Sequence, residues 1–253
     1  MFVEERKEKI LELLHEKERV SVNELSAQFK LSKVIIRKYL GELENEGLLE
    51  RTHGGAILKR KVINRVYLMD LMKEDYDKKL KISQKAVQLI KEGDMIFLDG
   101  STITLLIAEL LKESEIKITV ISNMLNIHEI LSKQENITLI SLGGVYDNLT
   151  NSFTGDLAKE NLKYFNPNKV FVGVAGINLN KMQISTCTIE EGQFKKAILN
   201  SGEKKYLLAQ DTKFYQDSLF NFSSLTEDIT IIGDDYISKE NITILKEKNI
   251  TLI

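Results

Sequence analysis

The chain of 253 residues has few of the residue types from which metal and redox sites are built. Its one cysteine, Cys187, excludes an internal disulfide and argues against a cysteine-based zinc site. The three histidines, His15, His53 and His128, lie far apart in the sequence, so we expect no metal site and no cofactor. The single proline, Pro167, excludes a proline-rich linker.

The chain also lacks a strong net charge and a long apolar run. The formal net charge is −2 and 28% of the residues are charged, so any electrostatic attraction to nucleic acid must be local. No run approaches the roughly 18 apolar residues that a membrane-spanning helix needs. The N-terminal MFVEERKEKILELL is charged from its start and does not resemble a signal peptide. We therefore expect a cytoplasmic protein without a membrane partner.

The length and the 43% of apolar residues leave room for two domains. In the first of these, residues 1–58, Ile10 and Leu14 lie on one stripe of an amphipathic helix. Ser21 precedes Glu24 by three residues, which is the spacing of a capping box at the start of a second helix.

A third helix is predicted to follow the N-cap residue Ser32. Ile36, Leu40 and Leu43 have the spacing of its buried face, and Gly47 is suited to end it. The sequence GLLERTHGGAIL then predicts two short extended runs around a Gly-Gly turn. Three helices and a hairpin form a winged helix-turn-helix, in which the third helix reads DNA.

The predicted recognition helix and hairpin carry basic residues, and no acidic residue occurs between positions 25 and 41. Basic side chains at these two places suit the phosphates of double-stranded operator DNA, and arginine and lysine also reach base edges. The predicted DNA contacts are Ser32, Lys33, Arg37, Lys38, Arg51 and His53. A solvated basic helix face and a protein-docking module are the alternative interpretations of this pattern.

The same segment resembles the DNA-binding domain of the DeoR family of bacterial repressors. That family carries Thr-Ile-Arg-Arg-Asp-Leu in the recognition helix, then Gly-Leu-Leu and His-Gly-Gly-Ala; this chain has IIRKYL, GLLER and HGGA in the same order. It departs from the family at Ile35, Lys38 and Tyr39, which replace threonine, arginine and aspartate. Because lysine cannot form the bidentate fork of arginine, the resemblance leaves the base preference of this chain open.

Residues 59–75 have no clean periodicity and are interpreted as a linker that packs on the larger domain, residues 76–253. In the larger domain seven short apolar runs, such as ITVISN and KVFVGVAGI, alternate in part with helical stretches. This pattern predicts a parallel sheet covered on both faces and an α/β fold overall. In such sheets, ligands bind at the carboxyl ends of the strands.

Polar residues that end these strands are candidate ligands for a small molecule. In LDGSTIT a strand leads into a helix, where backbone amides and the hydroxyls of Ser101, Thr102 and Thr104 suit a phosphate. An ordinary capped turn between strand and helix is the alternative. Gly143 and Gly144 follow another strand.

Two further features involve charged side chains. Glu191 and Lys195 are four residues apart on a predicted helix, and Lys213 follows a strand in AQDTKF. A lysine at a strand end can meet a phosphate. The alternatives are an ordinary ion pair on a helix surface and a solvated loop lysine.

These features recur in the same order in the DeoR-family sensor domain, which resembles the ribose-5-phosphate isomerase and CoA-transferase folds. The resemblance implies a homo-oligomer, either a dimer or a tetramer, with a phosphorylated sugar as effector. DGSTIT departs from the commoner Asp-x-Gly-Thr-Thr order of the family, and DTKF differs in register. The effector-binding residues that the resemblance implies are Asp99, Gly100, Ser101, Thr102, Thr104, Asn123, Gly143, Gly144, Glu191, Lys195 and Lys213.

Together the two resemblances predict a transcriptional repressor of a carbohydrate-utilisation operon, controlled by a phosphorylated sugar and without enzymatic activity. An enzyme similar to sugar-phosphate isomerases is the alternative, with Asp99, Glu191 and Lys213 as candidate base and electrophile. A regulator that acts through protein partners is a third interpretation. The attached DNA-binding domain favours sensing. The similarity to isomerase folds does not by itself imply an enzyme, because a fold does not determine a function.

Overall fold

The computed structural model describes residues 3–17, 19–58, 60–63 and 67–253. The chain forms two compact units, Met1–Lys61 with Ser238–Thr243, and Val62–Ile237 with Ile244–Ile253. Positions 59 and 64–66 of the predicted linker lie outside the described residues. Among the residues that are described, no helix is both long enough and apolar enough to cross a membrane.

The smaller unit contains the three predicted helices and a three-stranded antiparallel sheet. The helices are α1 (Val3–Lys17), α2 (Val22–Phe29) and α3 (Lys33–Asn45). The strands are β1 (Arg19–Ser21), β2 (Leu49–Thr52) and β3 (Gly55–Leu58), in the spatial order β1-β3-β2. This arrangement confirms the winged helix-turn-helix, with β2 and β3 as the wing. The sequence pattern did not indicate β1.

Capping interactions set the ends of α2 and α3 where the sequence predicts them. Ser21 Oγ accepts a hydrogen bond from Glu24 N, and Glu24 Oε2 accepts one from Ser21 N, both at 3.1 Å. Ser32 Oγ accepts a hydrogen bond from Ile35 N at 3.4 Å at the start of α3. After α3, Gly47 has a φ of +75°, a left-handed conformation that glycine adopts without strain.

The apolar faces of the three helices form one core in the smaller unit. Ile36, Leu40 and Leu43 of α3 are buried there, as predicted. Tyr39, one of the departures from the DeoR pattern, is also buried, and its hydroxyl accepts a hydrogen bond from Arg6 Nη1 at 3.4 Å. Tyr39 therefore packs α3 against α1.

The wing turn differs in one detail from the predicted Gly-Gly turn. The turn consists of His53 and Gly54, whereas Gly55 is already the first residue of β3. A Cβ atom on Gly55 would lie 1.8 Å from the carbonyl oxygen of Val20, while a Cβ atom on Gly54 would have no atom within 4 Å. Gly55 is thus required for the close approach of β3 to β1, and not for the turn.

A seven-stranded sheet forms the centre of the larger unit, and all of its neighbouring strands are parallel. Each of the seven apolar runs seen in the sequence forms one of these strands, which confirms the predicted α/β fold. In spatial order they are β17 (Thr251–Leu252), β16 (Ile229–Gly233), β13 (Lys204–Ala209), β10 (Lys169–Gly173), β5 (Met95–Leu98), β6 (Ile118–Ser122) and β7 (Ile137–Ser141).

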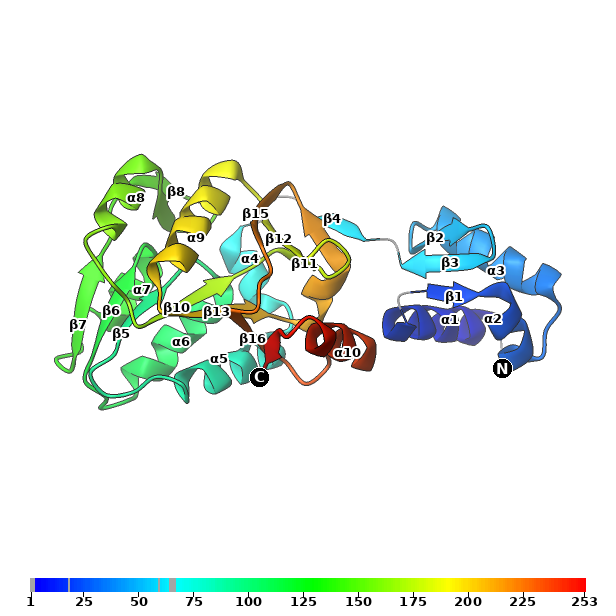
Figure 1. Cartoon of the computed structure of the whole chain (residues 1–253), viewed down its shortest axis with the longest axis horizontal. Helices are drawn as coiled ribbons and strands as arrows, with labels where there is room; N and C mark the ends of the chain where they lie inside the picture. The colour runs from blue at the N-terminus through cyan, green and yellow to red at the C-terminus, as the bar shows by residue number, and fades with distance from the viewer. Residues whose placement is uncertain (1–2, 18, 59, 64–66) are drawn as a thin grey trace. The chain divides into compact units, whose positions relative to one another are not determined.

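Helices cover both faces of this sheet (Figure 1). One face carries α5 (Tyr76–Val87), α6 (Thr102–Lys112) and α7 (Leu125–Leu131), and the other carries α8 (Asp156–Leu162) and α9 (Ile189–Ser201). A further helix, α10 (Lys239–Glu247), precedes β17. The two-sided cover buries every residue of β10, which explains its uninterrupted apolar run.

The order of the strands reverses between β5 and β10. From β5 the chain continues to β6 and β7 at one edge, whereas from β10 it continues to β13, β16 and β17 at the other edge. Leu98 at the end of β5 is paired with Phe171 of β10, so the loops that follow these two strands start close together. This is the topological switch point at which α/β sheets bind ligands.

Short antiparallel elements flank the main sheet, and the sequence pattern did not indicate them as separate sheets. One three-stranded sheet contains β11 (Gly176–Asn178), β12 (Gln183–Thr186) and β15 (Phe220–Ser224). A hairpin contains β8 (Val145–Asp147) and β9 (Ser152–Thr154).

The described part of the predicted linker is structured. It contains β4 (Lys61–Ile63), which pairs with β14 (Gln216–Ser218), and α4 (Leu68–Lys73). Leu68 is buried in the main core of the larger unit, so the expectation that this segment packs on the larger domain is confirmed. Its described residues 62–63 and 67–75 are called the connector below.

Substitution Gly55→Ala should lower the free energy of unfolding of the winged helix-turn-helix by about 1–3 kcal/mol, because the added Cβ overlaps the Val20 carbonyl. Gly54→Ala is the matched control and should change it by less than ~0.5 kcal/mol. Native-state hydrogen exchange of the amides in α2 and α3 of the full chain measures both effects. Equal amide protection in the two variants would contradict the close contact assigned to Gly55.

Candidate functional site

The residues predicted to contact DNA lie on the surface of the smaller unit. All six are exposed: Ser32, Lys33, Arg37, Lys38, Arg51 and His53. The first turn of α3 also exposes two apolar side chains, Val34 (72% exposed) and Ile35 (37% exposed). A recognition helix with exposed cations and exposed apolar groups near its N-terminus has what is needed to contact both phosphates and bases.

The charges of α3 are divided along its length. Lys38 Nζ lies 3.8 Å from Glu42 Oε1, and Glu42 Oε2 lies 2.8 Å from Lys7 Nζ of α1. The hydrogen bond from Lys7 lowers the pKa of Glu42, which therefore stays ionised. The acidic charge near the end of α3 is paired with basic partners, and the N-terminal half keeps its positive charge.

The wing is tied to the end of α3 through Glu44. Glu44 Oε1 accepts a hydrogen bond from Arg51 N at 2.9 Å, and Glu44 Oε2 lies 3.9 Å from Arg51 Nη1. The charge of Arg51 is thus partly balanced by a neighbour. His53 lies exposed in the turn of the wing.

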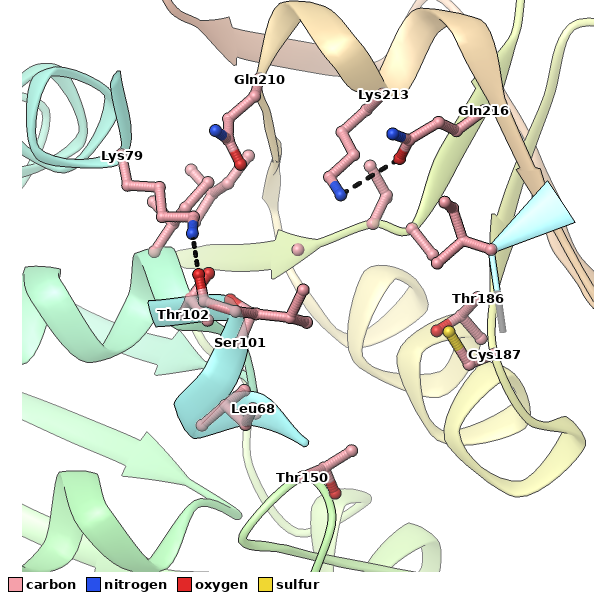
Figure 2. Close-up of a pocket in the computed structure, with 18 of the residues that line it drawn as sticks. Leu68, Lys79, Ser101, Thr102, Thr150, Thr186, Cys187, Gln210, Lys213 and Gln216 are labelled. Carbon is pink, nitrogen blue, oxygen red and sulfur yellow. Dashed lines mark hydrogen bonds between the residues drawn. The ribbon is translucent and has the colours of Figure 1, made fainter. Parts of the chain in front are cut away.

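A cavity of about 270 Å³ opens at the switch point of the larger unit. Its lining includes six of the predicted effector residues, Gly100, Ser101, Thr102, Glu191, Lys195 and Lys213. Figure 2 shows Lys79 and Lys213 reaching from different elements toward the space beside Ser101 and Thr102. Polar residues that were predicted to follow the carboxyl ends of β5 and β13 therefore line one shared cavity.

The first turn of α6 presents backbone amides at this cavity. Ser101 Oγ accepts a hydrogen bond from Thr104 N at 3.3 Å, and Thr104 Oγ1 accepts one from Ser101 N at 3.2 Å. The amides of Thr102 and Ile103 have no acceptor within the helix, because they lie in its first turn. Both residues line the cavity, so their amides and the helix dipole favour an anion there.

A buried ion pair links two lining residues, Lys195 and Glu191, to Asp99. Lys195 Nζ is 2.5 Å from Asp99 Oδ2 and 3.4 Å from Glu191 Oε1, and it donates to Gly173 O at 2.9 Å. Burial alone lowers the pKa of Lys195, but the Asp99 and Glu191 carboxylates outweigh it, so the pKa is raised overall. The ammonium charge of Lys195 is therefore matched within the protein.

Asp99 does not line the 270 Å³ cavity. Besides Lys195, its Oδ2 accepts a hydrogen bond from Gly173 N at 2.9 Å, whereas its Oδ1 lies 3.3 Å from Thr104 Oγ1. The Oδ2 atom thus has two donors from the protein. Direct contact of Asp99 with a sugar hydroxyl stays a prediction; in this structure Asp99 binds Lys195 and the amide at the end of β10.

Two further predicted residues, Thr104 and Asn123, also lie outside the lining of the 270 Å³ cavity. Thr104 is fully buried, and its Oγ1 donates a hydrogen bond to Asp99 O at 2.7 Å. Asn123 Nδ2 donates to Phe153 O at 2.8 Å, whereas its buried Oδ1 has no donor among the described residues. Asn123 borders an adjacent cavity of about 10 Å³, together with Asp99 and Lys195.

Gly143 and Gly144, also predicted to bind the effector, do not line the larger cavity either. A Cβ atom on Gly144 would lie 2.4 Å from Thr154 O, so glycine permits the close approach of β9. A Cβ atom on Gly143 would have no atom within 4 Å. The β8–β9 hairpin that follows them brings Thr150 to the cavity.

Lys79 and Lys213 bring two ammonium groups to the cavity whose hydrogen-bond partners are neutral oxygens. Lys79 is buried, and its Nζ donates to Leu71 O and, at 2.5 Å, to Glu74 O. Lys213 Nζ lies 3.3 Å from Gln216 Oε1. Burial lowers the pKa of both lysines, and the charge of Lys213 lowers the pKa of Lys79 further; the Glu74 and Asp75 carboxylates oppose this shift without reversing it. An anion bound near them would relieve both effects.

Lys79 and the connector were missed from the sequence. Lys79 does carry a signal, because it occupies the stripe of α5 on which Ile82, Ser83 and Ala86 are buried, where a lysine is unusual. The connector residues that line the cavity are Ile63, Leu68, Leu71, Glu74 and Asp75. Nothing in their irregular pattern indicated a ligand.

Other lining residues were also not predicted: Thr186, Cys187, Gln210, Thr212 and Gln216. Burial raises the pKa of the Cys187 thiol, so it stays protonated at neutral pH. Among the described residues, no group of three or more His, Cys, Asp and Glu side chains is arranged to hold a metal ion.

Two family models match the chain. The model described as the DeoR-like helix-turn-helix domain matches residues 6–62, and the model described as the DeoR C terminal sensor domain matches residues 74–235.

Relatives match over nearly the whole length. The lactose phosphotransferase system repressor of Lactococcus lactis subsp. lactis is 36% identical over 240 residues, which cover 94% of this chain and 93% of that protein. The transcriptional repressor AccR of Agrobacterium fabrum is 30% identical over 245 residues, covering 97% and 94%. Among solved structures, ribose 5-phosphate isomerase A of Methanocaldococcus jannaschii is similar with a TM-score of 0.42 and 17% identity, over 56% of this chain and 55% of that one.

Substitution Asp99→Asn should lower the free energy of unfolding of the larger unit by about 3 kcal/mol, because it leaves Lys195 buried with Glu191 as its remaining carboxylate partner. Asp235→Asn is the control, since Asp235 forms exposed pairs with Lys81 and Lys85 and should leave the stability unchanged. Urea unfolding followed by circular dichroism measures both. Equal stability of the two variants would contradict the central position given to Asp99.

Proposed function

The chain belongs to the DeoR family of transcriptional regulators, and from this membership we propose that it represses a carbohydrate-utilisation operon under the control of a phosphorylated sugar. One observation carries the effector half of the proposal. Two ammonium groups with neutral partners and the N-terminus of α6 meet at a single cavity. A phosphate monoester, which carries about −1.5 to −2 charges at pH 7, would give both ammonium groups a directly bonded anionic partner.

The rest of the cavity lining suits the hydroxyl groups of a sugar. Glu191, Gln210 and Thr186 provide carboxylate, amide and hydroxyl groups that accept or donate hydrogen bonds. The volume of about 270 Å³ is close to the lower end of the range for small-ligand pockets, ~300 Å³. A compact ligand with a phosphate at one end and hydroxyls at the other fits this volume and these lining groups.

Asn123 Oδ1, which has no donor among the described residues, fits a ligand of the same kind. The adjacent 10 Å³ cavity shares Gly100, Glu191 and Lys195 with the larger one, and it has room for about one water molecule. A bound water that donates to Asn123 Oδ1 would link Asn123 to the ligand without direct contact. In this way Asn123 keeps a role in effector binding.

The names of relatives support carbohydrate control and sensing. One relative is named as a repressor of a lactose phosphotransferase system, and another, from Escherichia coli O157:H7, as a putative aga operon repressor. Since these relatives are named as regulators, we assign the cavity to effector sensing and not to catalysis.

DNA reading is assigned to α3 and the wing. Lys33, Arg37 and Lys38 would contact phosphates and base edges in the major groove, with Arg37 able to make a bidentate contact to guanine. The exposed Val34 and Ile35 suit the methyl groups of thymine. Threonine also contacts that methyl group, so the replacement at Ile35 keeps this type of contact.

Control requires that the effector bind the DNA-competent and DNA-incompetent states with different affinity, and such coupling is typically ~1–3 kcal/mol. We place the chain in a homo-oligomer, a dimer or a tetramer, because paired half-sites require two recognition helices at a fixed spacing. The spacing of the helices is then the property that the effector changes.

Fluorescence anisotropy of the full chain on DNA from its own upstream region tests the proposal. The titration is run at two salt concentrations, with and without a panel of aldose and ketose phosphates. We expect sequence-selective binding that weakens with salt and that one panel member alters. DNA binding that no sugar phosphate alters, together with turnover of a panel member, would contradict the proposal and support an isomerase-like enzyme.

Substitution Arg37→Ala should weaken operator binding about 10- to 100-fold, the usual loss for one specific base contact, and leave sugar-phosphate binding intact. Lys196→Ala removes one exposed positive charge from α9 in the larger unit and serves as the control. Anisotropy measures both affinities. If the Arg37 variant kept the operator affinity of the wild type, the assignment of α3 to the DNA interface would be wrong.

Sugar-phosphate binding should take up protons above pH 7. The pKa values of Lys79 and Lys213 are lowered in the free protein, and a bound dianion raises them again, so affinity should fall as the pH rises through the lowered values. The phosphate itself contributes little there, since its second pKa is about 6.

Calorimetry in two buffers with different ionisation enthalpies measures this uptake. Lys213→Met should lower the affinity at least tenfold and reduce the uptake, whereas Lys196→Met should change neither. Proton release on binding at pH 8 would show that the two lysines do not face the phosphate.

A further inference from the structure

The connector forms part of the cavity wall, and Lys79 is one of the residues that hold it. Lys79 Nζ donates to the backbone oxygens of Leu71, in α4, and of Glu74, directly after α4. These carbonyls lie at the C-terminal end of α4, and Leu71 O also accepts a hydrogen bond from Glu74 N at 3.2 Å. The ammonium group of one cavity residue thus holds the end of this short helix.

Besides the β4–β14 pairing, further hydrogen bonds attach the connector to the rest of the larger unit. Ser218 Oγ donates to Ile63 O at 2.8 Å, and Leu68 N donates to Leu149 O at 2.8 Å. Gln210 Nε2 lies 3.4 Å from Asp75 Oδ2. Asp75 has a φ of +48°, an unfavourable conformation for a residue other than glycine, which persists only where its surroundings hold it.

An ammonium group has three protons to donate, and Lys79 uses two of them on the connector. Lys79 also lines the cavity, together with Thr102 and Lys213. Figure 2 shows its amino group at the edge of the space that Lys213 faces from the other side. An anion in the cavity can therefore accept the third proton while both bonds to the connector stay in place.

We infer that Lys79 is both a ligand of the effector's phosphate and the tether of the connector, so that phosphate binding and connector docking stabilise each other. This inference rests on the proposed function. The reason is electrostatic: an anion beside Lys79 and Lys213 offsets their mutual repulsion and holds the Lys79 ammonium group where it contacts Leu71 and Glu74.

The connector is also the segment of the chain between the winged helix-turn-helix and α5. Its docking fixes the point at which the chain leaves the larger unit. An effector that tightens this docking therefore acts on the segment through which the sensor and the DNA-binding domain are joined.

Hydrogen exchange of the full chain followed by mass spectrometry tests this inference, with inorganic phosphate as the probe. The reporter is the exchange of the hydrogen-bonded amides of Asp70, Leu71 and Glu74. In the wild-type chain, saturating phosphate should slow their exchange at least fivefold, the lower end of typical coupling. Lys79→Met should exchange faster, with no slowing by phosphate.

Two further variants complete the test. Lys81→Met is the matched control on α5, since Lys81 pairs with Asp235 at 3.1 Å and does not line the cavity; it should behave as wild type. Ser218→Ala removes the bond to Ile63 without changing a lining residue. Its connector should exchange faster without phosphate, and phosphate should restore protection because Lys79 is intact.

Phosphate binding to the wild-type chain without any change in connector exchange would overturn the inference and leave the proposed function standing. If the connector amides of Lys79→Met were as protected as those of the wild type, the inference would also be overturned and the proposed function would stand. If Lys79→Met does not fold, the Ser218→Ala variant decides. Slower connector exchange with phosphate in that variant supports the inference, and unchanged exchange overturns it. If calorimetry detects binding of neither inorganic phosphate nor any sugar phosphate to the wild-type chain, the proposed function fails and the inference fails with it.

Discussion

The Asp99 carboxylate connects the elements that surround the cavity. It follows β5, accepts a hydrogen bond from Gly173 at the end of β10 and pairs with Lys195 of α9, and Thr104 Oγ1 of α6 lies 3.3 Å from it. A buried ion pair of this kind contributes little net stability compared with an apolar pair, but the loss of one partner is strongly destabilising. Asp99 and Lys195 therefore fix one arrangement of the switch point, and the cavity geometry depends on it.

The cavity lining contains three lysines, Lys79, Lys195 and Lys213, and three carboxylates, Glu74, Asp75 and Glu191. Lys79 and Lys213 have neutral hydrogen-bond partners, and Thr102 and Ile103 at the start of α6 line the same cavity. Lysines that no carboxylate pairs directly favour an anionic ligand, whereas a catalytic site needs a base placed at a reacting proton. Asp99 Oδ2 accepts a hydrogen bond from Gly173 N and pairs with Lys195, so this oxygen is not placed as such a base. The charge distribution thus agrees with sensing, as the family membership indicates.

Much of the fold could be predicted because its signals are local. The capping box at Ser21, the N-cap at Ser32 and the seven apolar runs each act over a few residues, and all are found as predicted. Contacts between distant segments had no such signal: Gly55 is fixed by Val20 across the sheet, and Asp99 by Lys195 of α9. Six predicted effector residues line the cavity, but sequence order alone could not separate them from Asp99, which does not line it. Lys79 was missed because a charged residue on a helix normally indicates an exposed face.

A crystal structure of the full chain with a sugar phosphate selected by the anisotropy panel tests the central claim most directly. The account predicts the phosphate at the amides of Thr102 and Ile103, within hydrogen-bond distance of Lys79 and Lys213, with the sugar toward Glu191. A phosphate bound elsewhere, with Lys79 and Lys213 in contact with solvent alone, would contradict it.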